Sequence, residues 1–161
     1  MNGRERREFV KKHRTCVFGF ARKEHGPSMS VVYYVMDGDD LLISTMEGRA
    51  KAKAIKRNPK VSVAVLDENW PLSYLVLYGT AKIEPDTNAN LLMKICEVMA
   101  EGPIPETKRD ELVKMAKEER RVQVRFTPYA TFHSPPRHVH KPDDIDTLTH
   151  DYGANMPWDA D

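Results

Sequence analysis

The organisation of the chain is decided by one stretch, Ile43-Ser44-Thr45-Met46-Glu47-Gly48-Arg49-Ala50-Lys51-Ala52-Lys53-Ala54-Ile55-Lys56-Arg57-Asn58-Pro59. Its pattern predicts the end of a strand, a tight turn at Gly48, where a glycine gives the backbone freedom, and then a helix over residues 48–58. The alanine-rich run favours a helix. The helix is expected to end before Pro59, because the residue that precedes a proline is disfavoured in helical conformation.

Two hydroxyls and three cations surround the expected start of this helix. Ser44 and Thr45 come just before it, and Arg49, Lys51 and Lys53 lie in its first turns. Free N–H groups and the positive end of the helix dipole attract a phosphate or carboxylate, and an arginine adds a bidentate fork. Cations at this end of a helix also oppose the dipole, and many such faces are only solvated. The pattern therefore leaves an anion site and a solvated surface both open.

Composition excludes several classes of protein. The chain has 161 residues, enough for one domain, and its 25 Lys and Arg nearly balance its 24 Asp and Glu, which argues against a dedicated nucleic-acid binder. Two isolated cysteines, Cys16 and Cys96, make neither a disulfide scaffold nor a zinc site, so we expect a reducing, cytoplasmic location. We find no apolar run of membrane-spanning length and no signal-peptide core, and we expect no membrane partner.

Short strands are predicted on both sides of the opening stretch. A helix over 4–13 precedes strands at 15–22 and 28–36, which form an antiparallel hairpin, and a third strand at 41–44. Strands at 61–66 and 73–84 follow, with Gly79 as a bulge or bend. Short strands joined by hairpin signals are typical of a barrel or a sandwich.

The second half of the chain begins with an amphipathic helix after Pro85. Its apolar stripe predicts packing against the core or a subunit contact and consists of Leu91, Leu92, Ile95, Cys96 and Met99. A more polar helix over 106–118, a strand at 121–127 and a short strand at 129–133 come next. We therefore expect a domain over 1–133. Residues 134–161 are expected to be a tail that is either disordered or extended across the body or a partner subunit.

Four segments in this order, residues 27–34, 38–45, 48–62 and 74–83, resemble the flavin-binding split β-barrel family, which includes the pyridoxamine 5'-phosphate oxidases and the deazaflavin-dependent reductases. The resemblance implies a mainly β fold with peripheral helices (α+β), a six-stranded antiparallel split β-barrel of the FMN-binding type. It also implies a homodimer with the cofactor in a groove between the subunits. One departure is Ala54, where many members carry an asparagine before the apolar residue, here Ile55.

The resemblance also assigns site residues. Arg49 and Lys51 match the phosphate-binding pair, with Lys53 as a third contact, and residues 30–33 would line the ring. The complete cofactor-binding set that it implies is Ser30, Val32, Tyr33, Ser44, Thr45, Met46, Arg49, Ala50, Lys51, Lys53, Trp70 and Tyr74. Because successive residues of a strand face opposite ways, Tyr33 or Tyr34 is expected to point into the core.

The chemistry implied is that of the cofactor ring, so no catalytic side chain is required. We predict an oxidoreductase that transfers hydride or electrons between a deazaflavin (coenzyme F-420) or FMN and an unknown small organic substrate. The alternative is a non-catalytic protein that binds a flavin or another anionic ligand. His13 and His25 are expected to be isolated. His133 is either a proton donor or a structural residue, and His138 and His140 are not expected to form a metal site.

Overall fold

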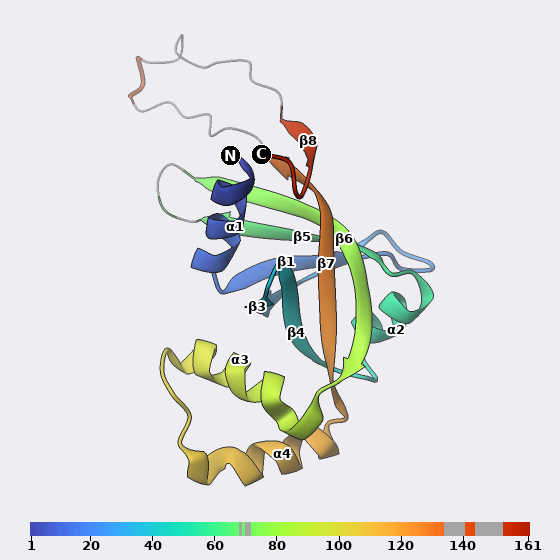
Figure 1. Ribbon diagram of the computed structural model, residues 1–161. Helices are drawn as coiled ribbons and strands as arrows, with labels where there is room; N and C mark the ends of the chain where they lie inside the picture. The colour runs from blue at the N-terminus through green and yellow to red at the C-terminus, as the bar shows by residue number, and fades with distance from the viewer. Residues whose placement is uncertain (68, 70–71, 134–140, 144–152) are drawn as a thin grey trace.

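The computed structural model describes residues 1–67, 69, 72–133, 141–143 and 153–161. The strands of this part of the chain form one antiparallel sheet (Figure 1), in the order β2-β1-β5-β6-β7-β4-β3. β8 pairs with the last residues of β7, beyond the part of β7 that pairs with β4. Their bounds are β1 (Thr15–Phe20), β2 (Ser28–Tyr33), β3 (Val35–Asp37), β4 (Asp40–Met46), β5 (Lys60–Asp67), β6 (Ser73–Pro85), β7 (Arg121–His133) and β8 (Ala154–Pro157).

The sheet closes into a split barrel because the chain passes from β2 directly into β3 at Tyr34, although these strands lie at opposite ends of the strand order. The sheet must therefore curl until its two ends approach. Alternating burial along β1 and β5 shows that one face of the sheet points into the barrel. The predicted fold class, mainly β with a few helices, is confirmed.

The strand count is larger than the six expected, since the described residues contain eight strands. The predicted strand at 28–36 is divided at Tyr34, whose ring is 2% exposed and whose hydroxyl donates a hydrogen bond of 2.6 Å to the Val10 carbonyl. The predicted separation at Pro128 does not occur, because β7 continues past it where the register with β6 shifts beside Gly79. β8 comes from a segment that has no strand pattern.

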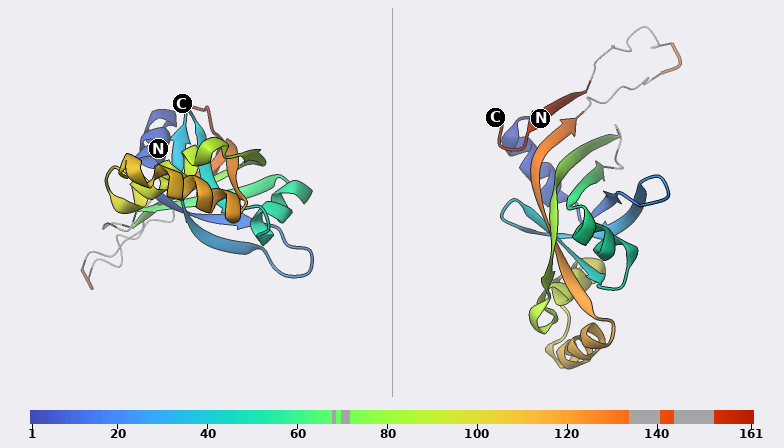
Figure 2. Two further views of the ribbon diagram at one scale, coloured as in Figure 1. Left: turned by 90° about the horizontal axis from the view of Figure 1, so that it is seen from below. Right: turned by 90° about the vertical axis from the view of Figure 1, so that its right-hand side faces the viewer.

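Helices pack against the barrel at two separate places (Figures 1 and 2). α2 packs against β1 and β6. The hairpin of α3 and α4 connects β6 to β7, and its α3 packs against β2 and β4. The helical bounds are α1 (Gly3–Lys12), α2 (Ala50–Arg57), η1 (Thr87–Ala89), α3 (Asn90–Ala100), η2 (Glu106–Lys108) and α4 (Arg109–Glu118). None of the helices in the described ranges is both long and apolar enough to cross a bilayer.

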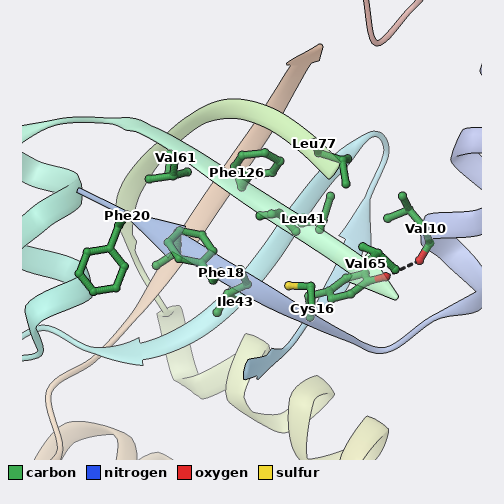
Figure 3. Packing of buried hydrophobic residues seen from close by; sticks show 14 of the residues in the cluster. Val10, Cys16, Phe18, Phe20, Leu41, Ile43, Val61, Val65, Leu77 and Phe126 are labelled. Atoms are coloured by element: carbon green, nitrogen blue, oxygen red, sulfur yellow. Dashed lines mark hydrogen bonds between the residues drawn. The ribbon is translucent and has the colours of Figure 1, made fainter. Parts of the chain in front are cut away.

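One main core fills the barrel. Figure 3 shows Phe18 of β1 beside Ile43 of β4, with Leu41 and Phe126 packed in the same cluster. A smaller cluster joins Leu42 to Leu91 and Ile95 of α3, so that part of the predicted apolar stripe packs against the barrel. Met99, at the end of that stripe, is 55% exposed.

The last residues of the chain return to the body. β8 pairs with β7, and Trp158 is 5% exposed within the main core. The fully buried Arg6 of α1 donates hydrogen bonds to the carbonyls of Pro157, Trp158 and Ala160. The two chain ends consequently lie side by side (Figure 1).

Candidate cofactor site

Two strand edges meet α2 where the barrel is split. In the described part of the chain β2 pairs with β1 alone, and β4 pairs with β3 only through residues 40–42. The outer edge of β2 and residues 43–46 of β4 therefore present backbone N–H and C=O groups outside the sheet ladder. β2 and β4 approach one another there without pairing. We call these two edges, with the turn and first turn of α2 at residues 46–53, the seam.

Polar side chains at the seam lack partners. Ser30 is the register neighbour of Phe18, so both side chains face the barrel interior. The hydroxyl oxygens of Ser30 and Ser44 are buried and have no hydrogen-bond partner among the described residues. Thr45, on the same face of β4 as Ile43, is 5% exposed. Buried hydroxyls without partners are uncommon and costly, and a bound water or a hydrogen-bonding ligand would satisfy them.

The cations at the start of α2 also lack acidic partners. No ion pair joins Arg49, Lys51 or Lys53 to an acid within the described ranges, whereas Lys56 of the same helix lies 3.0 Å from Glu47. Lys51 is 9% exposed, and its ammonium lies 5.2 Å from the centre of the Phe18 ring. Burial, with a contribution from the charge of Arg49, lowers the pKa of Lys51 to about 8.

This donor set fits a phosphate. The N-cap residue of α2, Arg49, makes no side-chain cap, so the first amides of the helix have no side-chain acceptor from this residue. The seam thus combines free helix N–H groups, a guanidinium, a buried ammonium and unpartnered hydroxyls. All of these groups can donate hydrogen bonds to an anion.

The remaining predicted residues are distributed around the seam. Val32 packs against the main core, and Tyr33 packs against the cluster of Leu42, Leu91 and Ile95. Met46 is half-buried on the outer face of β4. Ala50 and Lys53 line a groove of about 240 Å³ whose other lining residues are Phe20, Arg22, Lys23, Glu24, His25, Ala54 and Arg57.

One predicted residue, Tyr74, does not join the seam within one chain, and another lies outside the described residues. Tyr74 lies on β6, where it pairs with Leu66 of β5, and β1 and β5 stand between β6 and β2 in the strand order. Trp70 lies outside the described residues. His138 and His140 also lie outside them, and no group of three metal-ligating side chains is found in the part that is described.

Comparison with known proteins matches residues 3–133 to the family described as pyridoxamine 5'-phosphate oxidase. The chain belongs to this family. Similar solved structures include a conserved hypothetical protein from Mycobacterium tuberculosis, at 23% identity and a TM-score of 0.68 over 81% of this chain and 82% of that one. An F420 reductase is similar at 24% identity and a TM-score of 0.63, over 77% and 93% of the two chains. An FAD-binding protein from Mesorhizobium loti gives 20% identity and 0.55, over 81% and 90%.

Within this member of the pyridoxamine 5'-phosphate oxidase family, His13 and Glu47 have contacts that the sequence did not indicate. His13, expected to be isolated, has its Nδ1 2.6 Å from the Phe9 carbonyl and its Nε2 3.6 Å from Asp67. Glu47 contacts both Lys56 and Arg120. The contacts His13–Asp67 and Glu47–Arg120 each join residues far apart in the sequence, so no local pattern could have found them.

His133 is not a neighbour of the seam within one chain. It pairs with Ala154 at the end of β7, whereas Ser44 pairs with Gln123 near the start of that strand. Ten residues of strand correspond to roughly 30 Å. Burial lowers the pKa of His133, which favours the neutral imidazole at this end of the barrel.

Proposed function

We propose that this member of the pyridoxamine 5'-phosphate oxidase family is an oxidoreductase that transfers hydride or electrons between a bound deazaflavin (coenzyme F-420) or FMN and a small organic substrate. The observation that carries the proposal is Lys51, a buried ammonium without an acidic partner in the described structure. Family membership and the names of the similar F420 reductase and FAD-binding protein support a flavin-type cofactor.

The residues of the seam divide the work of holding such a cofactor. Arg49, Lys51 and the first amides of α2 would hold its phosphate, and the hydroxyls of Ser30 and Ser44 would bond its polar groups. The bound ring would supply the hydride or electron transfer. Phe18 and Thr45, both buried, would keep water from the inner side of the seam.

The groove beside the seam is relevant to the choice of cofactor. Arg22, Lys23, Lys53 and Arg57 line it, with Glu24 as the one acidic residue in the lining. FMN needs only the phosphate contacts. The acidic tail of coenzyme F-420 would find further cations in this groove, as expected for electrostatic complementarity.

The assembly that we propose is a homodimer with the cofactor at the subunit interface. The outward face of β1 and β2 is apolar, and Met29 and Val31 are 72% and 74% exposed. Tyr74, which is remote from the seam within one chain, would reach the cofactor across such an interface.

The second candidate function is binding without turnover. The donor groups of the seam support it equally, because Arg49, Lys51 and the hydroxyls of Ser30 and Ser44 can hold an anionic ligand without any turnover. The two functions are separated by supplying reductant and a quinone or enone to the cofactor-bound protein. Stable binding with no reduction of any acceptor supports this second function.

The test of the proposed site is titration with FMN and with F-420, using wild type and the double variant Arg49→Ala/Lys51→Ala. Charge-assisted hydrogen bonds contribute about 1.5–3 kcal/mol each, so the variant is expected to bind about 3–6 kcal/mol more weakly. Lys114→Ala/Lys117→Ala, two exposed lysines of α4, is the matched control. Equal affinity in wild type and the Arg49/Lys51 variant would move the site elsewhere, and failure of wild type to bind either cofactor at micromolar concentration would refute the proposed function.

A further inference from the structure

We propose that Glu47 is a positioning residue that fastens the phosphate-holding turn, residues 46–49, to the corner between α4 and β7. The inference rests on the proposed function for its ligand, because that turn leads into the first turn of α2. Its structural part, the fastening of the turn, can be tested without any cofactor.

Three contacts converge on Glu47. Its Oε1 lies 3.0 Å from the Lys56 ammonium, which belongs to the last turn of α2. Its Oε2 accepts a bond of 2.6 Å from the Arg120 guanidinium. Its backbone N–H donates to the Arg120 carbonyl at 2.9 Å. Glu47 therefore joins the turn both to α2, the helix that follows it, and to the corner between α4 and β7.

Apart from Glu47, backbone contacts hold the turn. Met46 pairs with Arg121 in the β4–β7 ladder. Arg49 N–H donates to the Met46 carbonyl at 3.1 Å, which closes the turn locally. Gly48 has no atom within 4 Å of the position that a Cβ would occupy, so no side chain packs on it. The side chain of Glu47 adds to this backbone support the side-chain contacts that join the turn to α2 and to the corner.

Arg120 is held in a conformation that its residue type disfavours. Its φ is +53°, in the left-handed region where glycine is preferred. Its N–H donates to the Lys117 carbonyl at 3.1 Å, and its carbonyl accepts from Glu47. Such backbone strain persists where the surrounding contacts determine it. Arginine at this position gives Glu47 a guanidinium partner that glycine would not supply.

The direction in which anion affinity changes when Glu47 is removed distinguishes a positioning role from a direct effect of its charge. A carboxylate next to a phosphate site would weaken anion binding if it acted by charge alone, so its removal would tighten binding. Both oxygens of Glu47 are instead engaged by cations, and hydrogen bonding and charge from Lys56, with help from Arg120, lower its pKa. If Glu47 acts by position, its removal loosens the turn and weakens binding.

The first experiment compares FMN with riboflavin, which lacks the phosphate, on wild type and Glu47→Gln. We expect FMN affinity to fall about fivefold, the upper range for exposed ion-pair contacts, with riboflavin affinity unchanged. The control is Glu111→Gln, which removes a similar exposed ion pair, Lys108–Glu111, from α4. Tighter or unchanged FMN binding by Glu47→Gln would overturn the positioning role. If wild type binds no cofactor, the proposed function fails, and the second experiment still decides the inference.

The second experiment uses the cofactor-free protein. Amide hydrogen exchange at positions 47 and 49 is expected to speed up about fivefold in Glu47→Gln, because opening of the turn exposes both amides. Arg120→Gly, which removes the guanidinium but relieves the positive φ, should show the same faster exchange without a lower Tm. Arg120→Lys, which keeps a cation, should largely restore protection. Unchanged exchange in Glu47→Gln and Arg120→Gly would refute the inference.

Discussion

At the scale of single residues, Lys51 is expected to favour cofactor binding while it lowers the stability of the cofactor-free fold. An ammonium in this place lacks the acid that would offset its loss of water, and burial lowers its pKa to about 8. Cys16 does not compensate, since burial raises the pKa of its thiol to about 12 and leaves it neutral at physiological pH. A buried cation kept without a partner in the protein is the arrangement expected where the partner is a ligand.

Lys51→Met is therefore expected to stabilise the cofactor-free protein at neutral pH while weakening FMN binding. The gain should be roughly 1 kcal/mol, as for other exchanges that remove a functional constraint. The folded-state pKa of about 8 lies below the ordinary 10.5, so the unfolded chain holds the proton more tightly between these values. Wild-type stability should then rise with pH through that window, and the advantage of the variant should shrink.

Urea unfolding of both proteins at neutral pH and at about pH 9.5 measures this difference, because the titration of all other groups cancels in the comparison. Lys51→Arg keeps a cation that does not lose its proton, and it serves as the control. A constant difference between wild type and Lys51→Met across the window would contradict the burial of the ammonium.

At the scale of elements, the C-terminal residues 153–161 behave as part of the barrel. Trp158 enters the main core, and its indole N–H donates to Asp39 at 3.0 Å. The Arg7 guanidinium lies 5.2 Å from the centre of the Trp158 ring. Gly153 lies so close to the Phe132 ring that a Cβ would be 2.2 Å from it. The segment thus packs into the barrel core beside α1.

Trp158→Ala is expected to destabilise the fold by about 3–5 kcal/mol, the usual cost of truncating a buried tryptophan. The matched control is Tyr129→Ala, a neighbouring aromatic that is 52% exposed, which should cost far less. Chemical unfolding followed by circular dichroism gives both values. Equal stability of the two variants would show that the segment is dispensable for the core.

The elements that sequence predicted best are those with a strong local pattern. The strands around 61–66 and 73–84 and the register shift at Gly79 follow from alternation and from one glycine, and β5 and β6 occupy them with slightly wider bounds. The four residues of β8 have no alternation, and their strand depends on pairing with β7. The division at Tyr34 likewise depends on a hydrogen bond to Val10, which no local pattern encodes.

The helix that carries the candidate phosphate contacts was predictable from the sequence, but the orientation of its side chains was not. The order of segments located Arg49 and Lys51 after the predicted third strand, which the structure gives as β4. Lys51 turns inward because α2 packs through its face at Ala52, Ala54 and Ile55, and that packing decides which lysine is buried. The Glu47–Arg120 contact spans 73 residues of sequence, so it depends on the complete fold.

At the scale of the whole molecule, the outward face of the sheet carries a row of apolar side chains. Successive register neighbours across four strands place Val31, Val17, Ala64 and Val76 in one row on this face. β2, which carries Val31 and Met29, is an edge strand in the described structure. An apolar face that ends in an exposed edge strand favours association with another chain, and proteins normally bury such a face. A second copy of this chain is the occupant that we propose.

Val31→Lys tests the homodimer directly. Val31 is 74% exposed within one chain, so lysine there should change monomer stability by no more than about 0.5 kcal/mol. In a dimer built on this face the same lysine would be buried without a partner, which is strongly unfavourable. We therefore expect sedimentation velocity to show a dimer for wild type and a monomer for the variant.

Cofactor affinity should fall in parallel, because the proposed groove lies between subunits. Met99→Lys, at an apolar position of α3 that is 55% exposed, should leave both properties unchanged. A Val31→Lys protein that remains dimeric would place the interface on another face, and the position of Tyr74 would then lose its explanation.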